Sequence, residues 1–252
     1  VTYSRLEKIT YPNSTDLYFN YETGDKASLL RLANLASSAS PSDEQTYETY
    51  AYLGVGTLVR VAHPAVAGGL VLTYGAAGVG YPGFDRFGRI VDQKWTCTAG
   101  VADRTRYGYD RSSNRTWREV GSEVVNRPTT LDEYYTHDGL DRLINVDRGV
   151  LGGTVGGERT APSSPSIERD YTLDPLGNWT GYVEKTGGSE TLNQTRNHNG
   201  VNELWNATAG SAITETAGDS WPDPAYDAAG NMTSMPRPLS LTSVRSSSSF
   251  VN

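Results

Sequence analysis

Short segments in which apolar and polar residues alternate run through most of the chain. The clearest lie between positions 85 and 138, for example Arg-Thr-Trp-Arg-Glu-Val at residues 115–120. A period of two places successive side chains on opposite faces of a β-strand. The pattern therefore predicts an all-β protein, an array of antiparallel strands with little helix.

The N-terminal segments are less regular. Residues 1–21 alternate around the turn Pro12-Asn13-Ser14, which predicts two strands. Residues 29–36 suit either a short amphipathic helix or a strand. We favour the strand, because residues 31–35 resemble residues 89–93, which follow a turn elsewhere in the chain.

Glycine and proline mark the connections further along. One long strand is expected from Tyr47 to Val61, and a loop or loosely paired hairpin from Pro64 to Pro82. The Gly and Pro clusters of residues 152–165 predict a loop insertion outside the sheet. Gly187-Gly188 is typical of a hairpin turn between two strands.

The segment Tyr226-Asp227-Ala228-Ala229-Gly230-Asn231-Met232 carries a pattern that recurs upstream. Asp can fold its carboxylate onto backbone N–H groups, and Gly supplies the positive φ of a tight turn. The unit predicts a β-hairpin with a loop of about four residues, built on a type I turn that glycine closes. The turn residues predicted in this way are Asp85, Gly88, Asp110, Asp138, Asp174, Gly177, Asn199, Asp227 and Gly230.

The copies follow one another at intervals of 25 to 36 residues. In the copy at Asn199, asparagine stands in for both Asp and Gly, which turn chemistry tolerates because Asn also adopts the left-handed region. Periods of about 20 to 50 residues are typical of arrays in which each unit buries its apolar face against its neighbours.

These copies, together with residues 5–13 (Arg-Leu-Glu-Lys-Ile-Thr-Tyr-Pro-Asn), resemble the RHS/YD-repeat proteins. The likeness covers roughly positions 3 to 235. It implies a long antiparallel sheet that spirals into a hollow shell. In bacterial RHS and Tc-type toxins such shells enclose a variable C-terminal effector, and in other large surface proteins they form structural barrels.

The resemblance sets the expected domain organisation. We expect residues 1–235 to form one repeat array and residues 236–252, rich in Ser and Pro, to be a tail or a terminal strand. The chain opens at Val1 in a strand-like segment without a signal peptide, so we expect it to be a segment of a longer polypeptide. A secreted or cell-surface location is what the family implies.

Composition and charge limit the classes of partner that the chain is expected to bind. The chain of 252 residues has 16 Tyr against 4 Phe, and its mean hydropathy is −0.51, as expected for a sheet with both faces near water. A formal charge of −7 argues against nucleic acid and anionic membranes. No apolar run is long enough for a membrane span. The single cysteine, Cys97, excludes an intramolecular disulfide.

Candidate chemistry is sparse. The repeated carboxylates would need to converge in pairs to act as a glycosidase, whereas turns of one spiral are spread along an edge. His63, His137 and His198 are isolated, and no nucleophile elbow, metalloprotease motif or phosphate-cradling loop occurs. A dense Asp loop for calcium is missing. Asp174-Pro175-Leu176-Gly177 shares elements with the autoproteolytic segment of RHS toxins but occupies a normal repeat position. We expect no catalytic residue, metal or cofactor.

Glycans are the remaining ligand class that the sequence suggests. Three of the Asn-x-Ser/Thr sites directly follow a repeat turn, and turns are exposed. The candidate sites are Asn13, Asn114, Asn178, Asn193, Asn206 and Asn231. The surplus of Tyr and Trp is also compatible with a carbohydrate-binding module that stacks sugars.

We therefore expect a structural, non-enzymatic segment of a large secreted or cell-surface protein, as part of a toxin-type shell. A building element of an extracellular fibre or adhesive assembly is the alternative. Partners would be flanking repeats or identical subunits that pair through edge strands, and an enclosed C-terminal effector.

Overall fold

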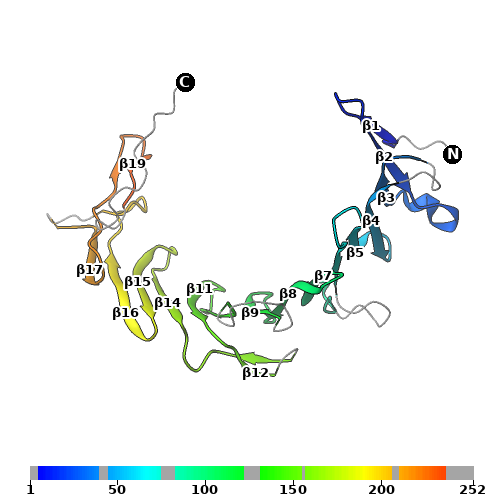
Figure 1. Ribbon diagram of the computed structural model, residues 1–252. Coiled ribbons are helices and arrows are strands. Elements are labelled where there is room, and N and C mark those ends of the chain that lie inside the picture. The colour runs from blue at the N-terminus through cyan, green and yellow to red at the C-terminus, as the bar shows by residue number, and fades with distance from the viewer. Residues whose placement is uncertain are drawn as a thin grey trace. The chain divides into compact units, whose positions relative to one another are not determined.

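The computed structural model describes residues 5–39, 45–74, 83–121, 131–154, 157–205 and 210–236. Within them, fifteen strands form one antiparallel sheet in the order β1 to β11 followed by β14 to β17 (Figure 1). Each strand lies beside its neighbour in sequence, except that the hairpin β12–β13 is inserted between β11 and β14. The prediction of an all-β antiparallel array is confirmed.

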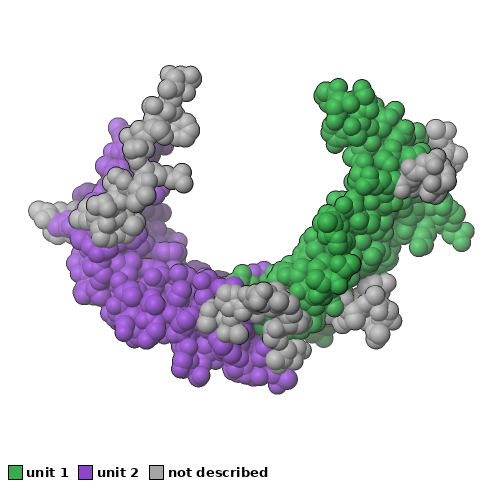
Figure 2. Space-filling model, in the orientation of Figure 1, with its two compact units in different colours: residues 1–108, 118–128 green, residues 109–117, 129–252 purple. Residues whose placement is uncertain are grey.

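The chain divides into two compact units (Figure 2). Unit 1 comprises Val1–Gly108 and Arg118–Pro128, and unit 2 comprises Tyr109–Trp117 and Thr129–Asn252. Strand β9 (Arg115–Val120) contributes residues to both units.

Among the described residues, unit 1 consists of eight strands and one 3-10 helix, η1 (Gly24–Leu29), which lies between β2 and β3. Its strands are β1 (Lys8–Thr10), β2 (Asp16–Tyr21), β3 (Leu32–Ala36), β4 (Thr46–Leu53), β5 (Thr57–His63), β6 (Leu70–Thr73), β7 (Asp92–Cys97) and β8 (Gly100–Tyr109).

Unit 2 has two small hairpins outside the main sheet. Its strands are β10 (Glu133–His137), β11 (Leu143–Arg148), β12 (Gly152–Gly153), β13 (Arg159–Thr160), β14 (Ile167–Leu173), β15 (Trp179–Thr186), β16 (Ser189–Arg196), β17 (Ile213–Ala217), β18 (Ala225–Tyr226) and β19 (Met232–Ser234). β12–β13 and β18–β19 form separate two-stranded sheets.

Two N-terminal predictions can be compared with these elements. The strand favoured for residues 29–36 is present as β3, with the 3-10 helix directly before it. The single strand expected from Tyr47 to Val61 is wrong. Gly54 takes a φ of 59°, and the turn that it opens divides the segment into β4 and β5.

The expected loops contain more strand than predicted. Within residues 64–82, β6 pairs with both β5 and β7, while positions 75–82 lie outside the described residues. The insertion at residues 152–165 contains the β12–β13 hairpin. The predicted tail lies outside the described residues from position 237 onward.

The sheet has little core. Most strand residues are half-buried, and all eight of β4 fall in this class. Buried apolar residues are few among the described residues: Ala36, Ala62, Trp117, Val146, Leu151, Ala212 and Ile213. The largest fully buried side chain is polar, Gln194. Backbone pairing and cross-strand side-chain pairs therefore hold the array together more than a thick apolar interior does.

Strand order decides where the repeat turns lie. Because consecutive antiparallel strands are joined alternately at their two ends, the β10–β11, β14–β15 and β16–β17 connections of unit 2 share one end. The turns that begin at Asp138, Asp174 and Asn199 fall in these three connections. We call this side of unit 2 the turn end.

Candidate functional site

Each repeat turn is closed by the side chain of its first residue. In the turn of residues 174–178, Oδ1 of Asp174 accepts hydrogen bonds from the N–H groups of Leu176 (2.8 Å) and Asn178 (2.9 Å). The carbonyl of Asp174 accepts the N–H of Gly177 at 3.0 Å. The same backbone closure recurs in the turns that begin at Asp85, Asp110, Asp138, Asn199 and Asp227.

The fourth residue of each turn has a positive φ. Glycine occupies this position in three turns, at Gly88 (77°), Gly177 (91°) and Gly230 (82°). In the other three turns the residues are Ser113, Asp141 and Asn202, with φ values of 74°, 62° and 66°. The repeat pattern identified the glycines but gave no role to Ser113 and Asp141. The structure adds them as equivalent turn positions.

The fifth residue binds the second oxygen of the first. Nε of Arg142 donates to Oδ2 of Asp138 at 2.7 Å, and Nδ2 of Asn178 donates to Oδ2 of Asp174 at 2.9 Å. In the turn of Asn199 the polarity is reversed, because the Asn199 amide donates to Oε2 of Glu203 at 2.6 Å. The two positions are therefore complementary: an acceptor at the first needs a donor at the fifth.

In unit 2 the fifth residue also reaches the next turn. Nδ2 of Asn114 donates to Oδ1 of Asp141 at 2.7 Å, and Nδ2 of Asn178 donates to Oδ1 of Asn202 at 2.9 Å. Both acceptors are the positive-φ residues of the following turn.

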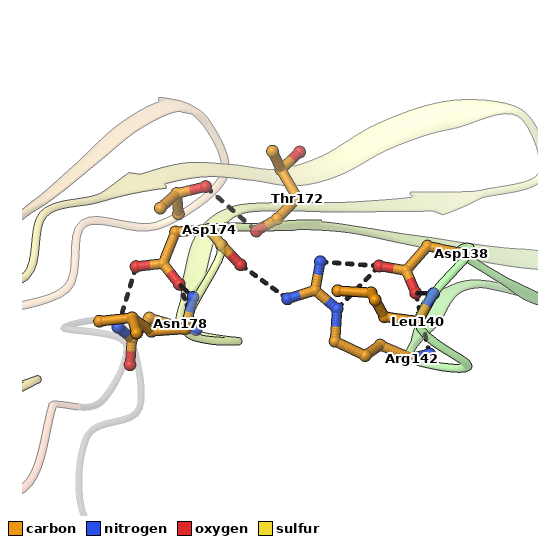
Figure 3. Close-up of polar contacts among 8 residues, drawn as sticks. Asp138, Leu140, Arg142, Thr172, Asp174 and Asn178 are labelled. Carbon is orange, nitrogen blue, oxygen red and sulfur yellow. Dashed lines mark hydrogen bonds and ion pairs between the residues drawn. The ribbon is translucent and has the colours of Figure 1, made fainter.

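The turn of Asp174 has Gly177 at that position and so offers no side chain. There, Nη1 of Arg142 reaches the main-chain carbonyl of Asp174 at 2.7 Å (Figure 3). The side chain of arginine is long enough to reach this main-chain oxygen, whereas the shorter Asn114 and Asn178 each bind a side-chain oxygen of the next turn. We call the four linked turns, residues 110–114, 138–142, 174–178 and 199–203, the turn ladder.

The same turn is also made without an aspartate. At residues 11–15, the N–H of Tyr11 donates to the carbonyl of Thr15, the N–H of Ser14 donates to the carbonyl of Tyr11, and Ser14 has a φ of 64°. The repeat pattern in the sequence did not identify this copy, because Tyr11 replaces the Asp at its first position. Backbone geometry defines the unit, and the Asp carboxylate stabilises it where it is present.

A second recurrent network lies on the strands and was not predicted. Tyr182 donates its hydroxyl to Glu184 two residues along β15 at 3.0 Å, and Nε of Arg169 on β14 donates to the same carboxylate at 2.8 Å. Tyr135 and Arg148 contact Glu133 in the same manner, at 2.6 Å each. The sequence signal is a Tyr and a Glu separated by one residue in a strand, which places both on one face.

In unit 1 a related network contains a histidine. Tyr50 donates its hydroxyl to Glu48, and Nδ1 of His63 lies 3.2 Å from the same carboxylate. The His63 ring stacks on Trp95, with ring centroids 5.9 Å apart. His63 is therefore part of a cross-strand contact.

Comparison with known proteins identifies the fold. Neither a protein-family model nor a curated protein matches the sequence. Among solved structures, a chain of the crystal structure of TcdB2-TccC3-TEV is similar, with a TM-score of 0.50 and 16% identity over 90% of this chain. The chain has the RHS-type β-array fold of Tc toxins. It spans 13% of the length of the Tc-toxin chain, and an identity this low establishes the fold alone.

The turn carboxylates of this RHS array are held in their ionised form. Hydrogen bonds from the Arg142 and Asn178 side chains, and from backbone N–H groups, hold the pKa values of Asp138 and Asp174 below their usual range. Asn231 does the same for the pKa of Asp227. A general acid needs a raised pKa, so these residues are poorly suited to donate a proton.

Asp147 on β11 behaves in the opposite way. Burial raises the pKa of Asp147, against a hydrogen bond from Asn145, and nearby Glu168 and Asp170 raise it further. Asn145 links Asp147 to Asp170 with bonds of 3.3 and 2.9 Å, and Lys185 pairs with Glu168. Asn145 and Lys185 thus engage the carboxyl groups of the cluster within the sheet. Across the residues that the structure describes, no group of three His, Cys, Asp or Glu side chains has the arrangement of a metal site.

The other two histidines of the RHS array lie at the ends of strands near repeat turns. His137 ends β10, and His198 bridges to Leu204 across the Asn199 turn. Burial lowers the pKa of His198, and its buried Nδ1 has no hydrogen-bond partner in the structure. No described nucleophile accompanies it within hydrogen-bond distance of that atom.

The glycosylation candidates fall into two groups. The side-chain amides of Asn114, Asn178 and Asn231 each donate a hydrogen bond from Nδ2 to the Asp of their own turn. A glycan attached to Nδ2 would compete with these bonds. Asn193 contacts Glu190, and Asn13 lies in an exposed turn. Asn206 lies outside the described residues.

One aromatic cluster has a stacking surface. Tyr171, Trp179 and Tyr182 lie with ring centroids 4.6 to 6.0 Å apart. The guanidinium of Arg196 covers Trp179 and Tyr182 at 5.4 and 5.7 Å. The arginine occupies ring area that a sugar would need for stacking.

No helix in the described part of the chain is long and apolar enough to cross a membrane.

Proposed function

We propose that this chain is a structural, non-enzymatic segment of an encapsulating shell of the Tc-toxin type. The observation that carries the proposal is the turn ladder. The acidic residues that recur along the chain are engaged by donors from their own turn, and the fifth residues of three turns also join the next turn. Such linked turns suit a repeating wall, and the carboxylates of the described turns serve the turns themselves.

The open sheet gives further support. Among the described residues, β1 has only β2 as a strand partner, and β17 has only β16. Each edge strand therefore has a row of backbone groups without a strand partner, and further strands can add there. This fits a wall built from more repeats than the fifteen-stranded sheet contains, in a secreted or cell-surface protein.

The same edges support a second function, a subunit of an extracellular fibre. In that case identical chains would pair end to end through β1 and β17. Electron microscopy of the protein from its natural source separates the two roles. Closed hollow particles with protease-resistant contents are expected for a shell, whereas filaments that lengthen with protein concentration would replace the shell with the fibre.

Catalysis is tested separately. The purified chain should not hydrolyse glycosidic, peptide or ester substrates. Turnover that a single substitution abolishes, such as Asp147→Asn or His198→Ala, would overturn the non-enzymatic role.

A further inference from the structure

In three of the four turns of the turn ladder, the residue at the outer tip is apolar and exposed. Leu140, Leu176 and Val201 each occupy the third position of a repeat turn, and they are 69%, 76% and 72% exposed. Leu143 and Trp179, just after two of these turns, are also exposed. We call these five residues the turn rim. Exposed apolar side chains gathered along one end of a sheet are typical of an interaction surface.

The ladder contacts fix the turns of the turn rim relative to one another. Arg142 joins the Asp138 turn to the Asp174 turn, and Asn178 joins the latter to the Asn199 turn. Successive turns are two strands apart, so the apolar tips recur about every 10 Å. Fixed spacing of this kind favours a partner with the same period.

The turn rim is hollowed between two of its tips. A depression of about 300 Å³ lies between the Asp138 and Asp174 turns. It is lined by Arg142, Leu143, Tyr171, Leu173, Gly177 and Trp179. This volume is at the lower limit for small-molecule pockets, and an aliphatic side chain fits within it. The turn rim therefore has both protruding apolar tips and a depression between two of them.

The tips of the turn rim carry no charge, although the exposed Asp141 lies next to Leu140, so two copies of the chain can meet there without repulsion between the tips. The chain carries a formal charge of −7, so two copies repel each other over most of their surface. The two outermost residues of these turns are Gly139-Leu140, Pro175-Leu176 and Gly200-Val201, with no charge among them. By contrast, the two preceding turns carry Arg86-Phe87 and Arg111-Ser112.

We propose that the turn rim is a docking surface for the turn rim of a second copy of this chain. A shift of half a period places the leucine tips of one copy beside the depression of the other. The contact is isologous, because the same patch faces itself across a two-fold axis. It differs from pairing of β1 or β17, since no backbone edge takes part.

Sedimentation velocity over a range of concentrations tests the contact in the complete chain. The wild type should form a dimer, and the triple variant Leu140→Glu, Leu176→Glu, Val201→Glu should sediment as a monomer with an unchanged circular dichroism spectrum. The matched control Val55→Glu, Val66→Glu, Val150→Glu adds the same charge at exposed positions outside the turn ladder and should still dimerise. A monomeric wild type, or a control that dissociates equally, would overturn the proposal. Association that persists in the rim variant would assign it to the strand edges.

Disulfide trapping gives a readout that does not depend on folding of the charged variants. In a Cys97→Ser background, a cysteine introduced by Leu176→Cys should link two copies on mild oxidation, because half a period brings opposing tips to about 5 Å. The substitution Val150→Cys should not. Equal trapping at both positions would contradict a specific contact through the rim.

Discussion

Arg142 and Asp174 are 32 positions apart, yet Nη1 of Arg142 donates a hydrogen bond of 2.7 Å to the main-chain carbonyl of Asp174. The same guanidinium pairs with Asp138 in its own turn. One side chain therefore closes one turn and fastens it to the next. Lysine has the charge for the ion pair but lacks the planar fork that serves both acceptors.

Arg142→Lys should accordingly lower the melting temperature of the chain, by about 2–4 °C if one net hydrogen bond is lost. Arg111→Ala, at the exposed tip of another turn, is the control and should leave the melting temperature within about 1 °C. Differential scanning calorimetry measures both. Equal melting of Arg142→Lys and wild type would show that the link between turns contributes nothing to stability.

Gly177 tests the backbone requirement of the turn. Its φ of 91° is strained for any residue with a Cβ, so Gly177→Ala should reduce the free energy of unfolding by about 1 kcal/mol or more. Gly139 lies in the neighbouring turn without a positive φ, and a Cβ there meets open space. Gly139→Ala should therefore be neutral or slightly stabilising in urea titrations. A cost as large at Gly139 as at Gly177 would rule out φ as the cause.

The sequence predicted the repeat and the all-β fold because both depend on local chemistry. Asp and Gly mark a turn within five residues, and alternation marks a strand within six. The break at Gly54 was missed, since one glycine in an alternating segment is also compatible with a continuous strand. The ladder contacts of Asn114 and Asn178 were missed for another reason. They join residues 27 and 24 positions apart, and only the spacing of neighbouring turns brings these together.

Acid should weaken the repeat turns. The pKa values of Asp138, Asp174 and Asp227 are lower in the folded chain than for free aspartate, near about 3.9. Their contribution to stability is therefore complete above that value and is lost as the pH falls through the folded pKa values. In urea unfolding, the contribution of these residues to the free energy of unfolding should be constant from pH 7 to about 5. It should decline below about pH 4. The variant with all three changed to Asn should decline less steeply, and an identical pH profile would contradict the linkage.

Tyr182 predicts a change at the alkaline end. Burial and the hydrogen bond to Glu184 raise the pKa of Tyr182 to about 12. Because the folded pKa lies above the ordinary value near about 10, the contribution is present below pH 10 and is lost as the pH rises through 12. The difference between the ultraviolet titrations of wild type and Tyr182→Phe isolates this phenol. Glu184→Gln should move its midpoint down, and a midpoint unchanged by that substitution would exclude the carboxylate as a cause.

The Asn199 turn suggests a swap that isolates the pairing of first and fifth residues. Asp174→Asn keeps Oδ1 for the N–H groups of Leu176 and Asn178, as Asn199 does in its own turn. It also places an amide donor opposite the amide donor of Asn178, so either the bond to Oδ2 is lost or the Asn178 amide turns over and gives up its N–H bond to Asn202. Asp174→Asn should therefore lower the melting temperature.

Adding Asn178→Glu should restore stability, because the pair then has the donor and acceptor of Asn199 and Glu203. The contact to Asn202 can persist if the Asn202 amide turns to present its N–H group to Glu. Asn178→Glu alone sets two acceptors against each other in the Asp174 turn and should be the least stable of the three. A double-mutant cycle on melting temperatures thus predicts strong favourable coupling. Additive effects would mean that the two positions act independently and that the complementarity seen in the turns has no energetic role.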